Sequence, residues 1–296
     1  MKLGKEEFKG IVLATEMKSL KVKVIYWVFF AFLSVLAVVC IFPVLWLLLS
    51  AFKNIDEFLM NPPTIIPRSF EFGKLFSVWR KIPAMQKAYI NTLIMGLGDI
   101  FFSLTVNGLA GYSLSRLKPK GHKLILALVL WTMMMPSAVS MVPLFMTFVD
   151  FPYLHVNLTN TFLPMWLMAA ANPFYVMLFK SFFDSIHISY IEAARLDGCK
   201  EISIFLRIVA PLSTPIMMTV VIFIMNGIWG SFLWPYLILR DPNLYTTGIR
   251  IYSLLNEVRI DEYYMAMLFV TFPPVIIYLL FQKNLMKGIS LGGIKG

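Results

Sequence analysis

The sequence is poor in charged residues, cysteines and histidines, and each shortage excludes a class of protein. Only 14% of the 296 residues are charged, whereas 59% are hydrophobic and the mean hydropathy is +0.76. Soluble domains carry about 25% charged residues, so we expect an integral membrane protein. Two cysteines, Cys40 and Cys199, are too few for a disulfide framework. His122, His155 and His187 fall in three separate loops, which excludes a shared metal site.

Catalytic motifs are also absent from the sequence. It contains no G-x-x-x-x-G-K-[ST] phosphate loop, no H-E-x-x-H zinc motif and no C-x-x-C pair. We therefore expect a transporter or channel that is not an enzyme and holds no cofactor in this chain. Any ATP chemistry would have to come from a partner.

The sequence does contain long apolar runs. Each exceeds the roughly 20 residues that a spanning helix needs, and none alternates between apolar and polar residues as a barrel strand would. The first run is too long for a signal-peptide core, and no small-residue cleavage site follows it, so it should be retained. The pattern predicts an all-α, polytopic membrane protein with six transmembrane helices, over residues 24–51, 88–114, 124–149, 158–183, 208–239 and 263–286.

The net charge of +10 indicates topology rather than a nucleic-acid partner. Six lysines precede the first run, four basic residues and no acid follow the second, and no basic residue lies between the third and fourth. The positive-inside rule then places both termini and the second and fourth loops in the cytoplasm. The first loop disagrees, although the rule weakens for long loops. Its basic residues are Lys53, Arg68, Lys74, Arg80, Lys81 and Lys87.

One charged, amphipathic segment, residues 189–215, separates the fourth and fifth runs. Ser189 and Glu192 have the spacing of a capping box, which predicts a helix start. Gly198 suits a helix end, because glycine adopts the left-handed conformation of a C-cap, and Pro211 and Pro215 follow. Apolar or small residues recur at three- and four-residue steps and predict one buried stripe: Ile191, Ala194, Gly198, Ile202 and Phe205.

Such a hairpin has two possible binding partners. It could lie on lipid headgroups, or it could fill a groove in another protein. Helices that bind membrane surfaces usually carry Lys and Arg along the polar face, whereas acids and bases balance here. The balance favours docking to a protein.

The same segment resembles a known family. Glu192, Ala193 and Ala194, then Gly198 after three residues and Pro211 further on, are similar to the EAA loop of ATP-binding-cassette importer permeases. The resemblance is closest to the second permease of maltose-type carbohydrate importers and covers most of the chain. The further blocks that carry it are NPPTIIP (61–67), GYSLSRLKPKG (111–121), MMMPSAVSMVPLF (133–145) and KGISLGGIKG (287–296).

The resemblance implies specific roles and partners. It implies that the loop at 184–210 couples to an ATPase through Glu192, Ala193, Ala194, Asp197 and Gly198. It also implies that the tail at 287–296, with Lys287, Gly292 and Gly293, contacts the ATPase dimer. The implied partners are a second, non-identical permease, two ATPase subunits that bind ATP and Mg²⁺, an extracytoplasmic solute-binding protein and the lipid bilayer.

The sequence departs from the family pattern at two places. Ala210 stands where the family usually has leucine, and Gly230 and Ser231 replace a common polar pair, whose role is therefore not transferred. The chain then divides into a cytoplasmic tail (1–23), a permease domain (24–286) and the terminal tail (287–296).

Polar groups within the apolar runs are candidates for the translocation path or for helix contacts, because they are costly in lipid. Asp99 is the only acid well inside a predicted helix. Trp229, Trp234 and Tyr236 could stack on a sugar ring or anchor helix ends at the interface. The path candidates are Asp99, Asn107, Asn172, Asn226, Trp229 and Ser231.

The function expected from the sequence and the resemblance is the permease subunit of an ATP-driven importer for a sugar or oligosaccharide, in a bacterial or archaeal cell membrane. One alternative is the same kind of permease with a non-sugar cargo. The other is an ion-coupled secondary transporter or channel, which should show inverted repeats, and none is evident.

Overall fold

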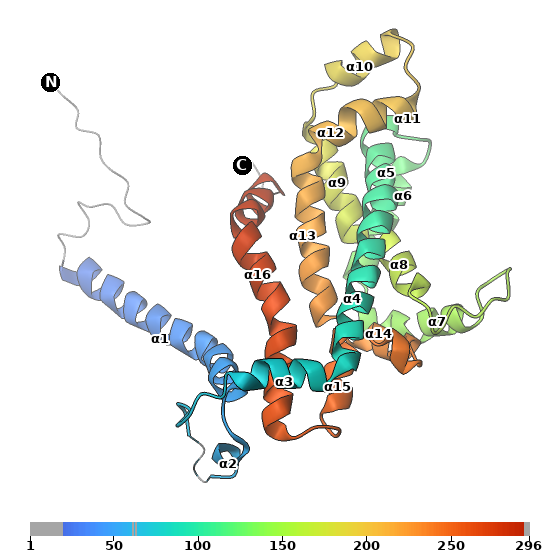
Figure 1. The fold of residues 1–296 in the computed structure, drawn as a ribbon. Coiled ribbons are helices and arrows are strands. Elements are labelled where there is room, and N and C mark those ends of the chain that lie inside the picture. The colour runs from blue at the N-terminus through green and yellow to red at the C-terminus, as the bar shows by residue number, and fades with distance from the viewer. Residues whose placement is uncertain (1–19, 61, 63, 293–296) are drawn as a thin grey trace. The chain divides into compact units, whose positions relative to one another are not determined.

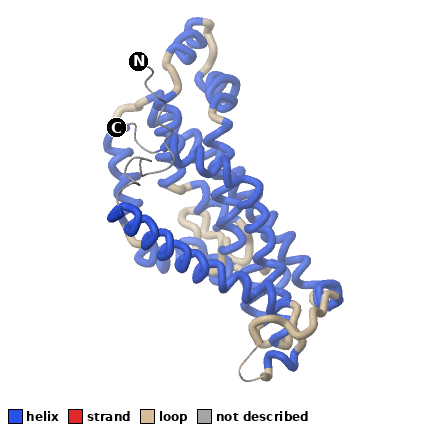
Figure 2. The backbone as a smooth tube through the Cα atoms, turned by 90° about the vertical axis from the view of Figure 1, so that its left-hand side faces the viewer, coloured by secondary structure: helices blue, strands red, loops and turns tan. Residues whose placement is uncertain are grey.

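The computed structural model describes residues 20–60, 62 and 64–292, with the backbone alone for Pro83 and for 283–292. Within these ranges the regular structure is helical (Figures 1 and 2), apart from one isolated bridge between Phe151 and Val156. The all-α prediction is confirmed. The chain separates into two units, Met1–Glu71 and Phe72–Gly296.

The first unit contains α1 (Leu20–Ala51) and the short α2 (Ile55–Phe58). α1 covers the first predicted run, and nearly all its side chains are exposed in the isolated chain, as a lipid-facing helix requires. The loop after α1 folds around Glu57, which is buried and accepts hydrogen bonds from Thr64 Oγ1 at 2.8 Å and from the Arg68 amide at 3.0 Å. Burial alone would raise the pKa of Glu57, but these hydrogen bonds outweigh it and lower the pKa.

The second unit is a set of packed helices. Its longest continuous helix among the described residues, Ala84–Leu117, runs from α4 through a π-helical turn at Ser103–Asn107 into α5 and ends in a second π-helical turn at Ser113–Leu117. The helices are α3 (Gly73–Lys81), α4 (Pro83–Phe102), α5 (Gly108–Tyr112), α6 (His122–Met134), α7 (Ser137–Val149), α8 (Leu163–Ala170), α9 (Pro173–Ser185), α10 (Ser189–Leu196), α11 (Glu201–Ile204), α12 (Ala210–Leu212), α13 (Thr214–Gly230), α14 (Leu233–Ile238), α15 (Thr247–Leu254) and α16 (Ile260–Gly292).

Three of the six predicted runs form unbroken helices that are long and apolar enough to cross a membrane: Leu20–Ala51, Ala84–Leu117 and Ile260–Gln282. Two runs are bent, by 106° between α6 and α7 and by 76° between α12 and α13, and each pair could form one span. The run at 158–183 is divided between α8 and α9. The first break contains Pro136, and the other two lie just before Pro173 and Pro215, because proline cannot continue the hydrogen-bond ladder of the preceding turn. The count of six spans stays a prediction.

Small residues bring the central helices of the second unit into close contact. α5 packs against α9, and a Cβ on Gly111 would lie 2.7 Å from the Cβ of Phe179. α4 packs against α8 in the same way, since a Cβ on Gly98 would lie 2.0 Å from Trp166 Nε1. That indole nitrogen instead donates to the Met95 carbonyl at 3.0 Å. The close packing positions α4, α8 and α9 around the site described below.

A group of ion pairs joins α3 to the start of α16. Lys74 Nζ lies 2.9 Å from Asp261 Oδ2, with side-chain exposures of 5% and 1%, and Lys81 Nζ lies 2.7 Å from Glu262 Oε1. Arg259 also contacts Asp261, at 3.1 Å. Two of the basic residues that oppose the positive-inside rule are therefore packing partners of acids within the fold.

Candidate functional site

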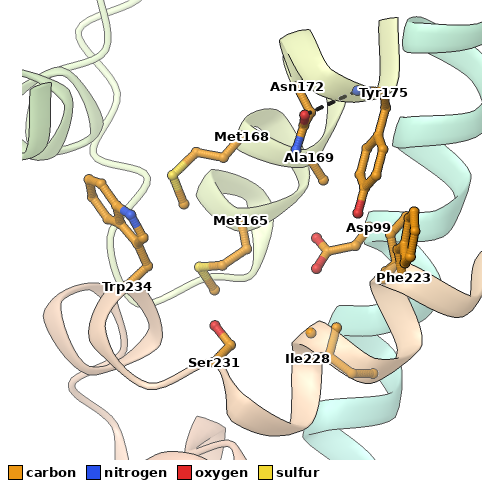
Figure 3. Close-up of a pocket in the computed structure, with 12 residues that line it drawn as sticks. Asp99, Met165, Met168, Ala169, Asn172, Tyr175, Phe223, Ile228, Ser231 and Trp234 are labelled. Carbon is orange, nitrogen blue, oxygen red and sulfur yellow. Dashed lines mark hydrogen bonds between the residues drawn. The ribbon is translucent and has the colours of Figure 1, made fainter. Parts of the chain in front are cut away.

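A cavity of about 310 Å³ lies between α4, α8, α9 and α13 (Figure 3). It brings together three of the six path candidates, Asp99, Asn172 and Ser231, from segments far apart in the sequence. Its other lining residues are Met165, Met168, Ala169, Tyr175, Phe223, Ile224, Gly227, Ile228 and Trp234.

Asp99 is the one charged side chain in the wall of this cavity. Figure 3 shows its carboxylate pointing into the cavity, with the Tyr175 hydroxyl directed toward it. Its Oδ1 atom is buried and has no hydrogen-bond partner among the described residues. A buried carboxylate oxygen without a donor is costly, and such a group in a membrane protein is a candidate for function.

Asn107 has a different role, because it stabilises the break between α8 and α9. Its Nδ2 donates to the Ala169 carbonyl at 2.8 Å, and its Oδ1 accepts from the Asn172 amide at 3.2 Å. Asn172 Oδ1 in turn caps α9, accepting from the amides of Phe174 and Tyr175. Irregular backbone within a bilayer needs such partners. Asn107 therefore stabilises the break between α8 and α9, and residues on both sides of this break line the cavity.

The structure does not bring the remaining two path candidates into the cavity. Asn226 donates to the Ile222 carbonyl of its own helix at 3.1 Å. Trp229 is buried, with its ring centroid 5.2 Å from that of Tyr89. Tyr175 was missed by the sequence analysis, yet Asn172 followed by Pro173 is a helix-start signal that could have located the break and hence Tyr175 one turn later.

A second cavity of about 510 Å³ adjoins the first and shares Met168, Asn172 and Trp234 with it. Hydroxyl groups of α7 contribute to its wall, namely those of Ser137, Ser140 and Thr147. Trp234 thus borders both cavities.

The other candidate site is the hairpin of α10 and α11, which lies at one end of the second unit, opposite α3, α14 and α15 (Figure 1). α10 ends as the sequence predicts. Gly198 has φ of +78°, its amide donates to the Arg195 carbonyl at 3.0 Å, and the Cys199 amide donates to the Ala194 carbonyl at 3.0 Å. These are the two hydrogen bonds of a Schellman motif, which positions the turn between the helices.

The capping box predicted at the start of α10 is wrong. Ser189 is already the first helical residue, and Ile188 at the N-cap position has no side-chain cap. The Ser189 hydroxyl instead pairs with His187 Nδ1 at 2.7 Å. Glu192 is exposed, so its carboxylate is available at the surface of the hairpin.

The predicted apolar stripe is confirmed in part. Ile191, Ala194 and Phe205 are buried, but Ile202 is 55% exposed and Gly198 lies in open space. The stripe fails at Gly198 and Ile202, because the turn at Gly198 changes the helix direction. Leu196 is 89% exposed, so the outer face of α10 presents an unpartnered apolar side chain close to Glu192 and Asp197.

Glu201 ties the hairpin to the helix bundle. Arg195 Nε donates to Glu201 Oε1 at 2.7 Å, and the Tyr112 hydroxyl donates to Glu201 Oε2 at 2.9 Å. The hydrogen bond from Arg195 is the main cause that lowers the pKa of Glu201, which stays ionised. Glu201 therefore links α10, through Arg195, to α5, through Tyr112.

The terminal residues are described in part. α16 continues through Lys287 to Gly292, so this part of the predicted tail is helical in backbone. Gly293 and residues 294–296 lie outside the described residues, as do residues 1–19 of the predicted N-terminal tail.

Comparison with known proteins decides the family. Residues 107–291 match the family described as binding-protein-dependent transport system inner membrane component. This chain belongs to that family. The permease is 32% identical over 270 residues to the arabinooligosaccharides transport system permease protein AraQ of Bacillus subtilis, covering 90% of this chain and 94% of that protein.

Two further relatives agree with this assignment. The diacetylchitobiose uptake system permease protein NgcG of Streptomyces coelicolor is 28% identical, covering 88% of the permease and 86% of that protein. A bacterial ABC transporter involved in the import of the acidic polysaccharide alginate has the same fold, with a TM-score of 0.77 at 19% identity, over 90% of the permease and 98% of that chain. The permease is a multi-pass membrane subunit of an ABC importer, and its family works with a binding protein.

Proposed function

We propose that the permease forms half of the translocation path for a sugar or oligosaccharide and pairs with a second, non-identical permease. The names of its relatives support a saccharide cargo, since they refer to arabinooligosaccharides, diacetylchitobiose and galactooligosaccharides. The cavity around Asp99 supports a polar cargo, because a bilayer-spanning chain gains nothing from an unpartnered carboxylate that meets only lipid.

The α10–α11 hairpin is the proposed contact with the ATPase. Leu196 at 89% exposure is the observation that carries this proposal, because an apolar side chain at the tip of a charged, preorganised hairpin is suited to a pocket on another protein. Glu192, Ala193, Asp197 and Gly198 lie on exposed positions around it, while Ala194 packs inward. Two ATPase subunits would bind ATP and Mg²⁺, and this chain would bind neither.

Coupling then follows from the contacts of the hairpin. Closure of the ATPase dimer would move α10, and the bonds from Arg195 and Tyr112 to Glu201 would pass that movement to the helix bundle. The bundle would change from inward-open to outward-open around the cavities. We also propose that the end of α16, with Lys287 and Gly292, and Gly293 beyond it contact the ATPase dimer.

The test of this function is uptake by the assembled transporter. In proteoliposomes that hold both permeases and the ATPase, with the binding protein outside, we expect ATP-dependent uptake of a labelled arabino- or galacto-oligosaccharide. The chain reconstituted alone should import nothing, because it supplies neither ATP hydrolysis nor the other half of the path. Uptake by the chain alone would contradict its role as a subunit, and an assembly that imports no saccharide would contradict the cargo.

The proposed orientation places the hairpin and both termini in the cytoplasm and six spans in the membrane. In intact cells, with Cys40 and Cys199 replaced by serine, an impermeant thiol reagent should label Leu154→Cys, whose parent side chain is 70% exposed in the loop after α7. Lys120→Cys, in the exposed loop before α6, should be labelled only after the membrane is opened. Labelling of Lys120→Cys in intact cells would reverse the orientation.

A further inference from the structure

We propose that the two adjoining cavities form a saccharide subsite of this chain itself, in which Asp99 accepts hydroxyl groups and Trp234 supports the ring, and that this subsite selects uncharged sugars. This inference rests on the proposed function and adds to it the chemistry of recognition. On this proposal the permease recognises its cargo through its own side chains, in addition to lining the translocation path.

The volumes suit a saccharide of at least two rings. Ligand sites usually measure about 300–1,000 Å³, and the first cavity, at about 310 Å³, lies at the lower end, which fits one ring-sized group. The second cavity adds about 510 Å³, and Met168, Asn172 and Trp234 line both cavities. A chain of sugar rings could extend from one cavity into the other past Trp234.

The polar groups of the first cavity are complementary to neighbouring hydroxyls. Asp99 lines this cavity and is partly exposed, so its carboxyl group can reach a cargo hydroxyl, while its Oδ1 atom is buried and has no donor among the described residues. A carboxyl group offers two oxygens about 2.2 Å apart, roughly the geometry with which it can hydrogen-bond to two adjacent hydroxyls of a sugar together. The hydroxyls of Tyr175 and Ser231 lie in the same wall and can donate or accept.

Trp234 provides the apolar surface that a sugar ring needs. Figure 3 shows its indole on the side of the cavity opposite Asp99, with Met165 and Met168 between them along the wall. A sugar ring has a flat face of C–H groups and a rim of hydroxyls, so one ring can pack against the indole while its rim faces Asp99. Phe148, which also lines the second cavity, contacts the indole edge to face, with ring centroids 6.2 Å apart and planes at 77°.

The charge of the walls excludes an acidic cargo. Among the residues that line the two cavities, all of which the structure describes, none is a lysine, arginine or histidine. A uronate carboxylate would therefore meet the Asp99 carboxyl group without a balancing cation, and two carboxyl groups cannot both be ionised at low cost in a site of low dielectric. The transporter that shares this fold is involved in the import of the acidic polysaccharide alginate. The fold itself therefore does not fix the charge of the cargo, and we expect Asp99 to be the residue that disfavours acidic sugars in this chain.

The test compares sugar import with ATP hydrolysis in the assembled transporter, with one binding protein used throughout. With a labelled galacto-oligosaccharide, Asp99→Asn and Trp234→Ala should lower import about tenfold, as loss of a hydrogen bond to a charged group or of a stacking surface predicts. Binding-protein-stimulated ATP hydrolysis should stay within about twofold, because the hairpin and its contacts are unchanged. Trp234→Phe should retain most import, since it keeps a flat ring.

Controls and contrary outcomes separate the subsite from simpler explanations. Asp150→Asn, at an exposed carboxylate outside both cavities, should leave import unchanged. If import and ATP hydrolysis fell together in Asp99→Asn and Trp234→Phe, these residues would only support the fold. Unchanged import in Asp99→Asn and Trp234→Ala, or wild-type import of an oligogalacturonate at the rate of the neutral sugar, would also overturn the proposal. A wild-type assembly that imports no saccharide would instead refute the proposed function.

Discussion

Replacing Asp261 by alanine should destabilise the permease by about 3–5 kcal/mol, the usual cost of removing one partner of a buried ion pair. The carboxylate of Asp261 is 1% exposed and lies 2.9 Å from Lys74 Nζ, whose side chain is only 5% exposed. Alanine would leave the ammonium group of Lys74 buried without this counter-charge, and it would weaken the link between α3 and α16. The thermal unfolding midpoint of the detergent-solubilised transporter measures the effect.

Two further variants isolate the cause of that loss. The double variant Lys74→Met with Asp261→Leu should recover most of the stability, because apolar residues of similar size can replace a buried pair at little cost. Asp150→Ala, which removes an exposed carboxylate paired with His155, should have no measurable effect. A single Asp261→Ala variant as stable as the wild type would show that the pair contributes nothing.

Substitutions on the outer face of α10 should uncouple the permease from its ATPase. Because no capping box forms, Glu192 has no cap to lose, and Glu192→Gln should barely change the helix itself. If Glu192 meets a cation in the ATPase cleft, loss of the charge at a desolvated contact should weaken ATPase co-purification and stimulated ATP hydrolysis roughly tenfold or more. The matched control is Glu257→Gln, at an exposed glutamate paired with Arg250 far from the hairpin.

Gly198 tests the same surface by shape. Gly198→Leu should abolish co-purification, because it adds bulk at the exposed turn of the hairpin and strains the backbone at φ of +78°. Gly198→Asn separates these effects, since asparagine tolerates the left-handed conformation but still adds a side chain. We expect Asn to impair docking while thermal stability stays close to that of the wild type. Wild-type coupling in both Glu192→Gln and Gly198→Asn would contradict the proposed docking face.

Local patterns in the sequence predicted several features correctly. Apolar run length predicted helices, since a chain in lipid must satisfy its own backbone. The end of α10 at Gly198 was predictable because a left-handed residue is needed there and glycine supplies it at least cost. The spacing of Glu192, Ala193, Ala194 and Gly198 indicated the family that the comparison assigns.

Tertiary packing decided the features that no local pattern contains. Hydropathy could not distinguish one continuous helix from the separate helices α8 and α9. The break between them is stabilised by the side-chain amide of Asn107, which comes from another helix. Two other failures, of the capping box and of the apolar stripe, were local instead, since the Ser189 hydroxyl pairs with His187 two residues earlier and the turn at Gly198 reorients the chain before Ile202.

The candidate site shows the same division. The sequence determined which polar side chains lie within the apolar runs, because Asp99, Asn172 and Ser231 can be read directly from their positions in those runs. Only the folded structure decided that these three meet Tyr175 and Trp234 around one cavity, whereas Asn226 bonds to its own helix. The physical reason is that a side chain's surroundings depend on which helices touch, and Gly98 and Gly111 set those contacts through close approach to Trp166 and Phe179, residues more than sixty positions away along the chain.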